Sequence, residues 1–214
     1  MTEVEVWWGR IDQVREEYAD DLDPVEAQRM NAYVRADDSA RFLLGCTMVR
    51  SVLARRFSLP AASIRLNRTC PECGGPHGKV RADGVELSVT HAGDVVGVAV
   101  GDAPLGLDVE QVDPTIDVDG LARLSLSEQE RDALPQDDPG ARARAFTALW
   151  TRKEAVVKAT GDGIRTDLRT ITGPPAGFHV MDVTVDRGYA AALAVISPEP
   201  PDVRTFRFGS GPRR

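Results

Sequence analysis

Long apolar runs, cysteine and histidine are all scarce in this 214-residue sequence. No apolar run approaches the ~20 residues of a membrane-spanning helix, so we expect no membrane partner. The first five residues are acidic where a secretory signal peptide would be basic, and three cysteines are too few for a disulfide framework. Both observations predict a cytoplasmic protein whose thiols are reduced or bound to metal.

Positive charge is also in short supply. The chain has 26 Lys and Arg residues against 33 Asp and Glu, which gives a net charge of -7. A protein that binds nucleic acid in general normally carries a basic surplus, so this balance argues against a nucleic-acid partner. Only Lys79, Lys153 and Lys158 are lysines. In a chain that otherwise uses Arg, these three indicate places where a compact ammonium group is needed.

The periodicity of apolar residues predicts an α+β protein composed of two α/β halves. We assign the N-terminal half to residues 1–103 and the C-terminal half to residues 104–208, and we expect residues 209–214 to be a disordered tail. Strands are expected at 4–8, 85–90, 94–100, 105–109, 178–185, 189–196 and 203–208, and helices at 24–36, 39–57, 117–125 and 141–160. Each half then combines a small sheet with one long helix.

Short local patterns mark the ends of several helices. Asp23 followed by Pro24 is typical of an N-cap with proline at the first helical position. Ser127 and Glu130 have the spacing of a capping box, and Gly161 is placed to be a C-cap.

Residues 105–110 carry a pattern of two carboxylates on one strand face. Alternation along a strand places Gly106, Asp108 and Glu110 on the same side. Two carboxylates at alternate positions of one strand provide hard oxygen ligands, and the neighbouring glycine lets a ligand approach the backbone. Such an arrangement suits a Mg²⁺ ion that also binds phosphates. An isolated pattern of this kind is more often a solvated strand face, so it needs support from elsewhere in the chain.

The long helix expected at 141–160 gives that support. Lys153 falls near the centre of its apolar stripe, with Glu154 at the edge. An ammonium group there must lose its water, so we expect a nearby anion, either a carboxylate or a bound phosphate. Trp150, Glu154 and Lys158 recur at helical spacing and form a ridge able to offer a ring, an acid and a base to one ligand.

Several motifs of the chain stand at the spacing of one known family. The C-terminal motifs are Gly106 to Glu110 and, roughly forty residues later, Phe146, Trp150, Lys153, Glu154, Lys158, Gly161 and Gly163. The N-terminal motifs are Arg41 to Gly45 with Val49 and Arg50, Gly78 with Lys79, and Leu87 to His91. Together they resemble the paired signature of surfactin-type (Sfp-like) 4'-phosphopantetheinyl transferases. The resemblance covers about residues 28 to 163, which is most of the chain.

This resemblance implies a fold and an activity. The implied fold is a pseudo-two-fold monomer with two similar subdomains that clasp coenzyme A in the cleft between them. The implied reaction moves the 4'-phosphopantetheine arm of coenzyme A onto a serine of an apo acyl or peptidyl carrier protein and releases 3',5'-ADP. Such carriers belong to fatty acid, polyketide or peptide synthases, including those of secondary metabolite biosynthesis.

The same resemblance implies a role for each matching residue. Asp108, Glu110 and Glu154 would hold Mg²⁺, or Mn²⁺ in its place, against the pyrophosphate, and Glu154 would be the base that accepts the serine proton. The remaining residues would bind the substrate: Lys153 and Lys158 neutralise phosphates, Thr90 and His91 contact phosphate oxygens, and Arg41 and Lys79 hold the nucleotide end. Lys158 and His91 would complete the catalytic set with Glu154.

Two departures from the family pattern leave contacts open. Val80 stands where proline often follows the Gly-Lys pair. The lysines that some members place in the first helix against the nucleotide have no clear match, although Arg29 and Arg35 lie nearby.

Two other functions compete with the transferase. One is a Mg²⁺-dependent hydrolase of a nucleotide pyrophosphate, which would consume coenzyme A without a carrier protein. The other is a non-catalytic zinc-binding interaction module built around Cys70, Cys73 and His77, which have the turn of a zinc knuckle but lack a second Cys pair. Zinc analysis of the purified protein would identify such a module.

Overall fold

The computed structural model describes residues 1–70, 73–76, 78–161, 163 and 166–209. His77 of the zinc-knuckle pattern and residues 210–214 of the expected tail lie outside these ranges. The helices are α1 (Pro24–Asn31), α2 (Ala36–Phe57), α3 (Val118–Ser125), α4 (Glu128–Asp132) and α5 (Pro139–Thr160), with short 3-10 helices η1 (Ile11–Gln13), η2 (Glu16–Asp21), η3 (Ala61–Ser63) and η5 (Leu168–Thr170). The strands are β1 (Glu3–Arg10), β2 (Glu86–Ala92), β3 (Val95–Gly101), β4 (Leu105–Gln111), β5 (Phe178–Asp182), β6 (Tyr189–Ile196) and β7 (Asp202–Arg207).

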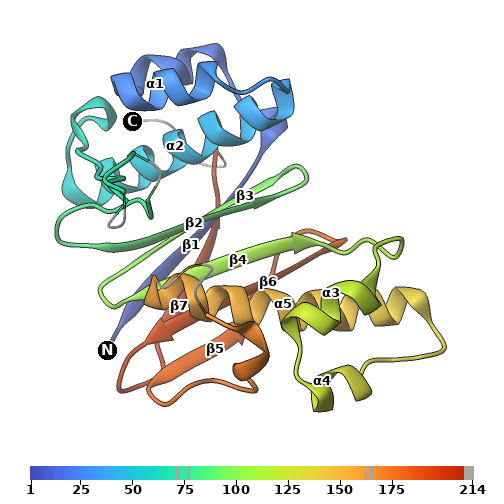
Figure 1. The fold of residues 1–214 in the computed structure, drawn as a ribbon. Coiled ribbons are helices and arrows are strands. Elements are labelled where there is room, and N and C mark those ends of the chain that lie inside the picture. The colour runs from blue at the N-terminus through green and yellow to red at the C-terminus, as the bar shows by residue number, and fades with distance from the viewer. Residues whose placement is uncertain (71–72, 77, 162, 164–165, 210–214) are drawn as a thin grey trace.

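The strands form two separate sheets, as expected for an α+β protein. The first has the order β2-β3-β1-β7, and the second has the order β4-β6-β5. Helices α1 and α2 cover the first sheet, while α5 runs along the second sheet and α3 lies beside it (Figure 1). No helix in the described ranges is long and apolar enough to cross a membrane.

Strand β7 belongs to the first sheet, although it is the last strand of the chain. Residues 203–208 were assigned to the C-terminal half, but β7 pairs in parallel with β1 at the edge of the first sheet. Phe206 stacks on Trp7 with ring centroids 4.5 Å apart, so the crossing strand also adds aromatic packing to that edge. The assignment of the strand expected at 203–208 to the C-terminal half is therefore corrected, because strand pairing between distant segments leaves no local mark in the sequence.

The expected helix ends are confirmed where a cap defines them. The Asp23 side chain accepts a hydrogen bond from the Glu26 amide, Ser127 does the same for Glu130, and both caps are complete capping boxes. Gly161 takes a left-handed conformation with φ of 78° and ends α5. Helix α1 stops at Asn31, earlier than expected, because residues 32–35 turn the chain into α2.

The two halves share an apolar core. Strand β1 contributes Val4, Val6 and Trp8, and these side chains form one buried cluster with residues of the second sheet, namely Leu105, Leu107, Val109, Leu193 and Val195. A separate cluster lies between α2 and the other face of the first sheet. Because the first sheet is covered on both faces, it holds α2 and the second sheet in fixed relation to each other.

Gly106 allows β4 to lie directly against α5. A Cβ atom at this position would overlap the carbonyl oxygen of Ala155 and the amide nitrogen of Ala159, which are backbone atoms of the helix. No side-chain adjustment relieves such an overlap, so only glycine permits this close approach.

We therefore expect Gly106→Ala to lower the free energy of unfolding by about 1–3 kcal/mol, because the strand and the helix must move apart. Gly173→Ala is the matched control, since a Cβ there would meet no atom within 4 Å. Thermal unfolding of both variants measures the effect. Equal melting temperatures for the two variants would contradict the close-packing argument.

Candidate active site

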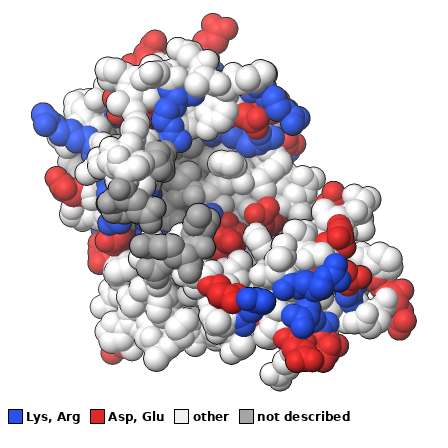
Figure 2. All heavy atoms as spheres, in the orientation of Figure 1, with Lys and Arg blue, Asp and Glu red and all other residues white. Residues whose placement is uncertain are grey.

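A cleft of about 720 Å³ lies between the two halves. Its walls come from α1 and α2, from the segment around Gly78 and Lys79, from β2, and from the C-terminal part of α5. Figure 2 shows acidic side chains in a hollow between the upper part of the molecule, which carries α1 and α2, and the lower part, which carries α5. Residues from both ends of the sequence thus meet around one space.

One end of the cleft continues into a smaller cavity of about 310 Å³. The residues that line it are Val89, Thr90, His91, Asp108, Glu110, Trp150, Glu154 and Lys158. His91, Glu154 and Lys158 line both spaces, so the two are continuous. The structure therefore brings together six of the site residues expected from the sequence.

Asp108 is at the centre of this cavity and is 3% exposed. Its Oδ1 atom accepts hydrogen bonds from Lys158 Nζ at 2.6 Å and from Thr90 Oγ1 at 3.3 Å. Its Oδ2 atom is buried and has no hydrogen-bond partner in the described part of the chain. Burial raises the pKa of Asp108, although Lys158 acts in the opposite direction. An unpaired buried carboxylate oxygen is costly, which makes Oδ2 a natural ligand for a cation.

The two other carboxylates of the cavity are affected in the same way. Burial, followed by the charge of Asp108, raises the pKa of Glu110 to about 7. The same two causes raise the pKa of Glu154. The charge of Asp108 raises the pKa of both glutamates, so a cation bound among these carboxylates would relieve repulsion.

The carboxylates fit a magnesium ion only as part of a mixed ligand set. Among the residues that the structure describes, no three His, Cys, Asp or Glu side chains form a group that could hold a metal alone. Lys158 already occupies Asp108 Oδ1. Mg²⁺ commonly takes one or two carboxylates together with substrate phosphates and water, and the free Asp108 Oδ2 fits such a set.

Hydroxyl groups of β2 hold β4 in register beside it. The Leu107 amide donates to Ser88 Oγ at 3.0 Å, and the Val109 amide donates to Thr90 Oγ1 at 3.2 Å. Thr90 also accepts a hydrogen bond from Lys158 Nζ at 3.2 Å. The sequence analysis missed Ser88, whose signal was its alternation with Thr90 on one face of the strand.

Lys79 and Arg41 line the walls of the cleft, and each donates to at least one backbone carbonyl. Lys79 Nζ donates to Leu105 O at 3.2 Å and to Lys158 O at 2.8 Å, and thus links the N-terminal half to β4 and α5. Burial lowers the pKa of Lys79. Arg41 Nε donates to Gly93 O at 2.6 Å. Both cations line the cleft with part of their hydrogen-bonding capacity already used.

His91 stands where the cleft and the small cavity meet. Partial removal of its ring from water, followed by the charges of Lys158 and Arg41, lowers the pKa of His91. The ring is therefore held neutral near pH 7, with one nitrogen to donate and one to accept a hydrogen bond.

Lys153 is not part of this site. Its Nζ atom makes an ion pair with Glu130 Oε2 at 2.6 Å and donates to Leu168 O at 3.0 Å, and the side chain is 3% exposed. It lines a different cavity of about 460 Å³, together with Leu149, Val156 and Met181. The expected anion is thus a carboxylate of the protein, and the assignment of Lys153 to coenzyme A phosphate is not supported, because Lys153 and Lys158 project from different faces of α5.

The cysteines do not contribute to the cavity of the carboxylates. All three lie in the described part of the chain, and none is joined by a disulfide. Cys46 is buried in α2, and burial followed by the charge of Glu26 raises the pKa of its thiol to about 12. Such a thiol is a poor nucleophile at neutral pH.

Comparison with known proteins finds one family. Residues 104–201 match the model of the 4'-phosphopantetheinyl transferase superfamily. The chain is 34% identical over 136 residues to 4'-phosphopantetheinyl transferase psf-1 of Bacillus pumilus, an alignment that covers 63% of this chain and 56% of that protein. The chain thus spans little more than half the length of that relative.

Two longer alignments have lower identity. 4'-Phosphopantetheinyl transferase Sfp of Bacillus subtilis (strain 168) is 25% identical over 195 residues, which is 85% of each chain. 4'-Phosphopantetheinyl transferase HetI of Nostoc sp. is 27% identical over 211 residues, covering 90% of this chain and 87% of the relative.

We expect Lys153→Ala to lower the free energy of unfolding by about 3 kcal/mol, because it removes the buried cation that pairs with Glu130. The neighbouring Arg152→Ala is the matched control. Its ion pair with Asp182 joins side chains that are 44% and 60% exposed and should contribute less than about 1 kcal/mol. Denaturant unfolding without ligand compares the two variants. A Lys153→Ala protein as stable as the wild type would exclude a structural role for the pair.

The raised pKa of Glu110 predicts a pH dependence of stability in the metal-free protein. Because the folded state holds the proton more tightly, the contribution of Glu110 is fully present below pH 4.5, its model value, and is lost as the pH rises through about 7. Glu110→Gln should remove this loss. The melting temperature of the variant, compared with that of the wild type, should therefore rise as the pH increases from 5 to 8. A constant difference between the two melting curves across this window would refute the assignment.

Proposed function

We propose that the chain is a member of the 4'-phosphopantetheinyl transferase superfamily and that it transfers the 4'-phosphopantetheine arm of coenzyme A to a serine of an apo carrier protein. The observation that carries this proposal is the Lys158–Asp108–Thr90 cluster, which stands beside Glu110 and Glu154 at the end of a cleft lined by cations. The cluster joins both motifs of the family signature in one cavity.

The cleft suits a long polyanionic substrate. Its described walls carry Arg29, Arg41, Arg68, Lys79 and Lys158, against Glu154 and Asp167. This local surplus of positive charge contrasts with the net charge of -7 for the whole chain. Coenzyme A, whose phosphates carry several negative charges, would be attracted to this surface while most of the protein repels it.

In the proposed reaction the serine oxygen of the carrier attacks the β-phosphorus of coenzyme A. A new bond forms between that oxygen and phosphorus, the phosphorus–oxygen bond of the pyrophosphate breaks, and 3',5'-ADP leaves with the bonding electron pair. Catalysis of such a transfer depends on positioning and on neutralising charge. Lys158 would neutralise charge on the pyrophosphate, and His91 and Thr90 would bind its oxygens.

Glu154 is the proposed base. It lies in both the cleft and the small cavity, and burial followed by the charge of Asp108 raises its pKa above its usual value, which makes the carboxylate a stronger base. Mg²⁺ or Mn²⁺, held by Asp108, Glu110 and Glu154 only together with substrate phosphates and water, would supply charge neutralisation at the pyrophosphate when bound. Asp108 would contribute its Oδ2 atom, which has no other partner among the described residues.

The remaining parts of the proposal concern partners and setting. We infer acyl or peptidyl carrier protein domains as the acceptors, a monomer as the active form, and the cytoplasm as the compartment. The absence of disulfides among the three cysteines, all described, is compatible with a reducing compartment. The likeness to 4'-phosphopantetheinyl transferases supports the class of acceptor.

We expect a panel of apo carrier proteins, incubated with the enzyme, coenzyme A and Mg²⁺, to gain the mass of one phosphopantetheine arm. Excess chelator should stop the transfer, and added Mg²⁺ should restore it. Asp108→Asn should abolish turnover, and Glu154→Gln should reduce it by about 10²–10⁴-fold through loss of the base. Asp83→Asn, an exposed carboxylate in a turn, is the control and should be fully active. Intact-mass spectrometry measures each case.

One outcome would replace the proposed function, and another would change only its mechanism. Consumption of coenzyme A without any carrier would indicate a pyrophosphate hydrolase instead. Undiminished turnover of Asp108→Asn, or in excess chelator, would remove the metal from the mechanism.

A further inference from the structure

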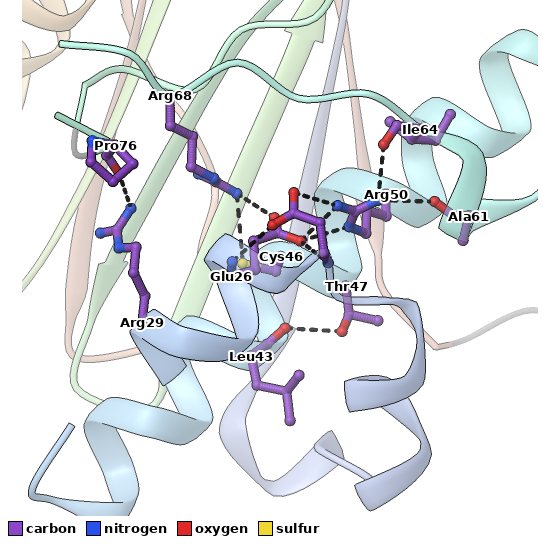
Figure 3. A network of polar contacts seen from close by, with 11 residues as sticks. Glu26, Arg29, Leu43, Cys46, Thr47, Arg50, Ala61, Ile64, Arg68 and Pro76 are labelled. Atoms are coloured by element: carbon purple, nitrogen blue, oxygen red, sulfur yellow. Dashed lines mark hydrogen bonds and ion pairs between the residues drawn. The ribbon is translucent and has the colours of Figure 1, made fainter. Parts of the chain in front are cut away.

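The polar network around Glu26 lies within the N-terminal half of the chain (Figure 3). Glu26 is 0% exposed. Its Oε2 atom accepts from Arg50 Nε at 2.8 Å, and its Oε1 atom accepts from Arg68 Nη2 at 2.7 Å. Because Arg50 lies in α2 and Arg68 lies in the segment before β2, the network joins α1, α2 and that segment. It does not hold β2 against the carboxylates of β4, which belong to the other half.

Side chains of β2 make the connection to β4, one hydrogen bond at every second residue. Ser88 and Thr90 each accept a hydrogen bond from an amide group of β4. The next position in this series is Ala92, which has no polar side chain. A connection made by β2 side chains alone would therefore end at Thr90, just before His91.

The hydroxyl group of Tyr189 supplies the next connection. Asp94, in the turn between β2 and β3, donates its amide to Tyr189 Oη at 3.1 Å. Tyr189 is the first residue of β6 and pairs with Gln111 at the end of β4. The Val112 amide also donates to Gly188 O at 2.8 Å, which fixes the start of β6 to the chain after β4. The tyrosine thus joins the turn to the strand that carries the carboxylates.

The turn is shaped to accept this hydroxyl group. Gly93 has a φ of 50°, a conformation that favours glycine. A Cβ atom there would come within 2.5 Å of Tyr189 Oη and within 3.0 Å of Gln111 Oε1. Arg41 Nε donates to Gly93 O at 2.6 Å. The turn is therefore held by α2 of the N-terminal half and by β6 of the C-terminal half, and a glycine leaves room for the second contact.

The position of His91 depends on this turn. His91 is the last residue but one of β2 and stands where the cleft and the small cavity meet. Partial removal of the ring from water, then the charges of Lys158 and Arg41, lower its pKa, and Asp38 acts in the opposite direction. Tyr189 itself lines neither space. A shift of the turn would move the His91 ring relative to Lys158 and remove no group from the site.

We propose that Tyr189 is a positioning residue, whose hydroxyl group holds the turn after β2 and so fixes His91 of one half against Lys158 and the carboxylates of the other half. The inference rests on the proposed function for the role of His91, which is to bind the pyrophosphate of coenzyme A. Because Tyr189 does not line the site, it acts only through His91.

The kinetic test uses Tyr189→Phe, which removes the hydroxyl group and keeps the ring. We expect KM for coenzyme A to rise about 5–20-fold, because the His91 ring no longer stands at the pyrophosphate, and kcat to stay within about twofold of the wild type. Tyr18→Phe is the matched control, since it removes a tyrosine hydroxyl from the core between α2 and the first sheet. It should leave KM unchanged. A wild-type KM in Tyr189→Phe would overturn the inference.

A double-mutant cycle tests whether Tyr189 acts through His91. His91→Ala alone should raise KM for coenzyme A at least as much as Tyr189→Phe does. Adding Tyr189→Phe to His91→Ala should then have no further effect, because the group that the tyrosine positions is already gone. Effects that multiply in the double variant would show that Tyr189 acts by another route, and the inference would be wrong.

An NMR titration of the His91 ring needs no substrate and separates this inference from the transferase activity. In Tyr189→Phe the pKa of His91 should rise towards 6.5, its ordinary value, because the ring moves away from Lys158 and Arg41. Tyr18→Phe should leave the titration unchanged. A raised pKa in a protein that transfers nothing would refute the proposed function and keep the positioning role. An unchanged pKa in Tyr189→Phe would overturn the positioning role even if transfer occurs.

Gly93→Ala decides the case if Tyr189→Phe does not fold. The new Cβ atom would overlap Tyr189 Oη and push the turn away while the tyrosine stays in place. KM for coenzyme A and the His91 titration should therefore change as in Tyr189→Phe. Gly84→Ala is the matched control, because its φ of 74° is also left-handed but a Cβ there would meet no atom within 4 Å. Wild-type values in Gly93→Ala would overturn the inference.

Discussion

The junction between β2 and β4 carries the candidate site. Both are edge strands of their sheets, and an edge strand presents amide groups that need partners. Here the partners are the hydroxyl groups of Ser88 and Thr90, which accept from the β4 amides of Leu107 and Val109. Because side chains make this connection in place of a strand ladder, the sheets meet without merging, and the carboxylates of β4 open into the space between the halves.

The close contact of β4 with α5 completes the geometry. Without a Cβ at Gly106, the strand lies against the helix backbone near Ala155 and Ala159. The same contact brings Lys158 over Asp108, and Lys79 ties the carbonyl of Lys158 to the N-terminal half. A single glycine thus allows three segments far apart in sequence to share one charged cluster.

Ion pairs in this protein serve two purposes that their residue types do not reveal. Lys153–Glu130 and Lys158–Asp108 have the same 2.6 Å separation and lie on the same helix. The first lines a separate cavity and leaves none of its buried polar atoms unpaired among the described residues, whereas the second leaves Asp108 Oδ2 unpaired and lines the cavity of the carboxylates. Glu26 combines both purposes, since it completes a capping box for α1 and holds Arg68 at the cleft. Spare hydrogen-bonding capacity, more than charge itself, separates the pairs assigned to the proposed function from the structural ones.

The sequence by itself determined the features that depend on neighbours along the chain. The caps at Asp23, Ser127 and Gly161, and most bounds of the long elements, follow from local backbone chemistry and periodicity. The common face of Asp108 and Glu110 follows from strand alternation. The likeness to a known family rested on the spacing of such local motifs and was confirmed by the comparisons.

Only the tertiary structure decided which distant groups meet. In the structure, β7 pairs with β1 of the first sheet, and Lys153 pairs with the carboxylate of Glu130. Ser88 and Arg68 line the cleft. A helix pattern shows that a buried lysine needs an anion but not which anion is within reach. Partner choice depends on how the chain folds back on itself, and packing of the whole core sets that path, since no single segment encodes it.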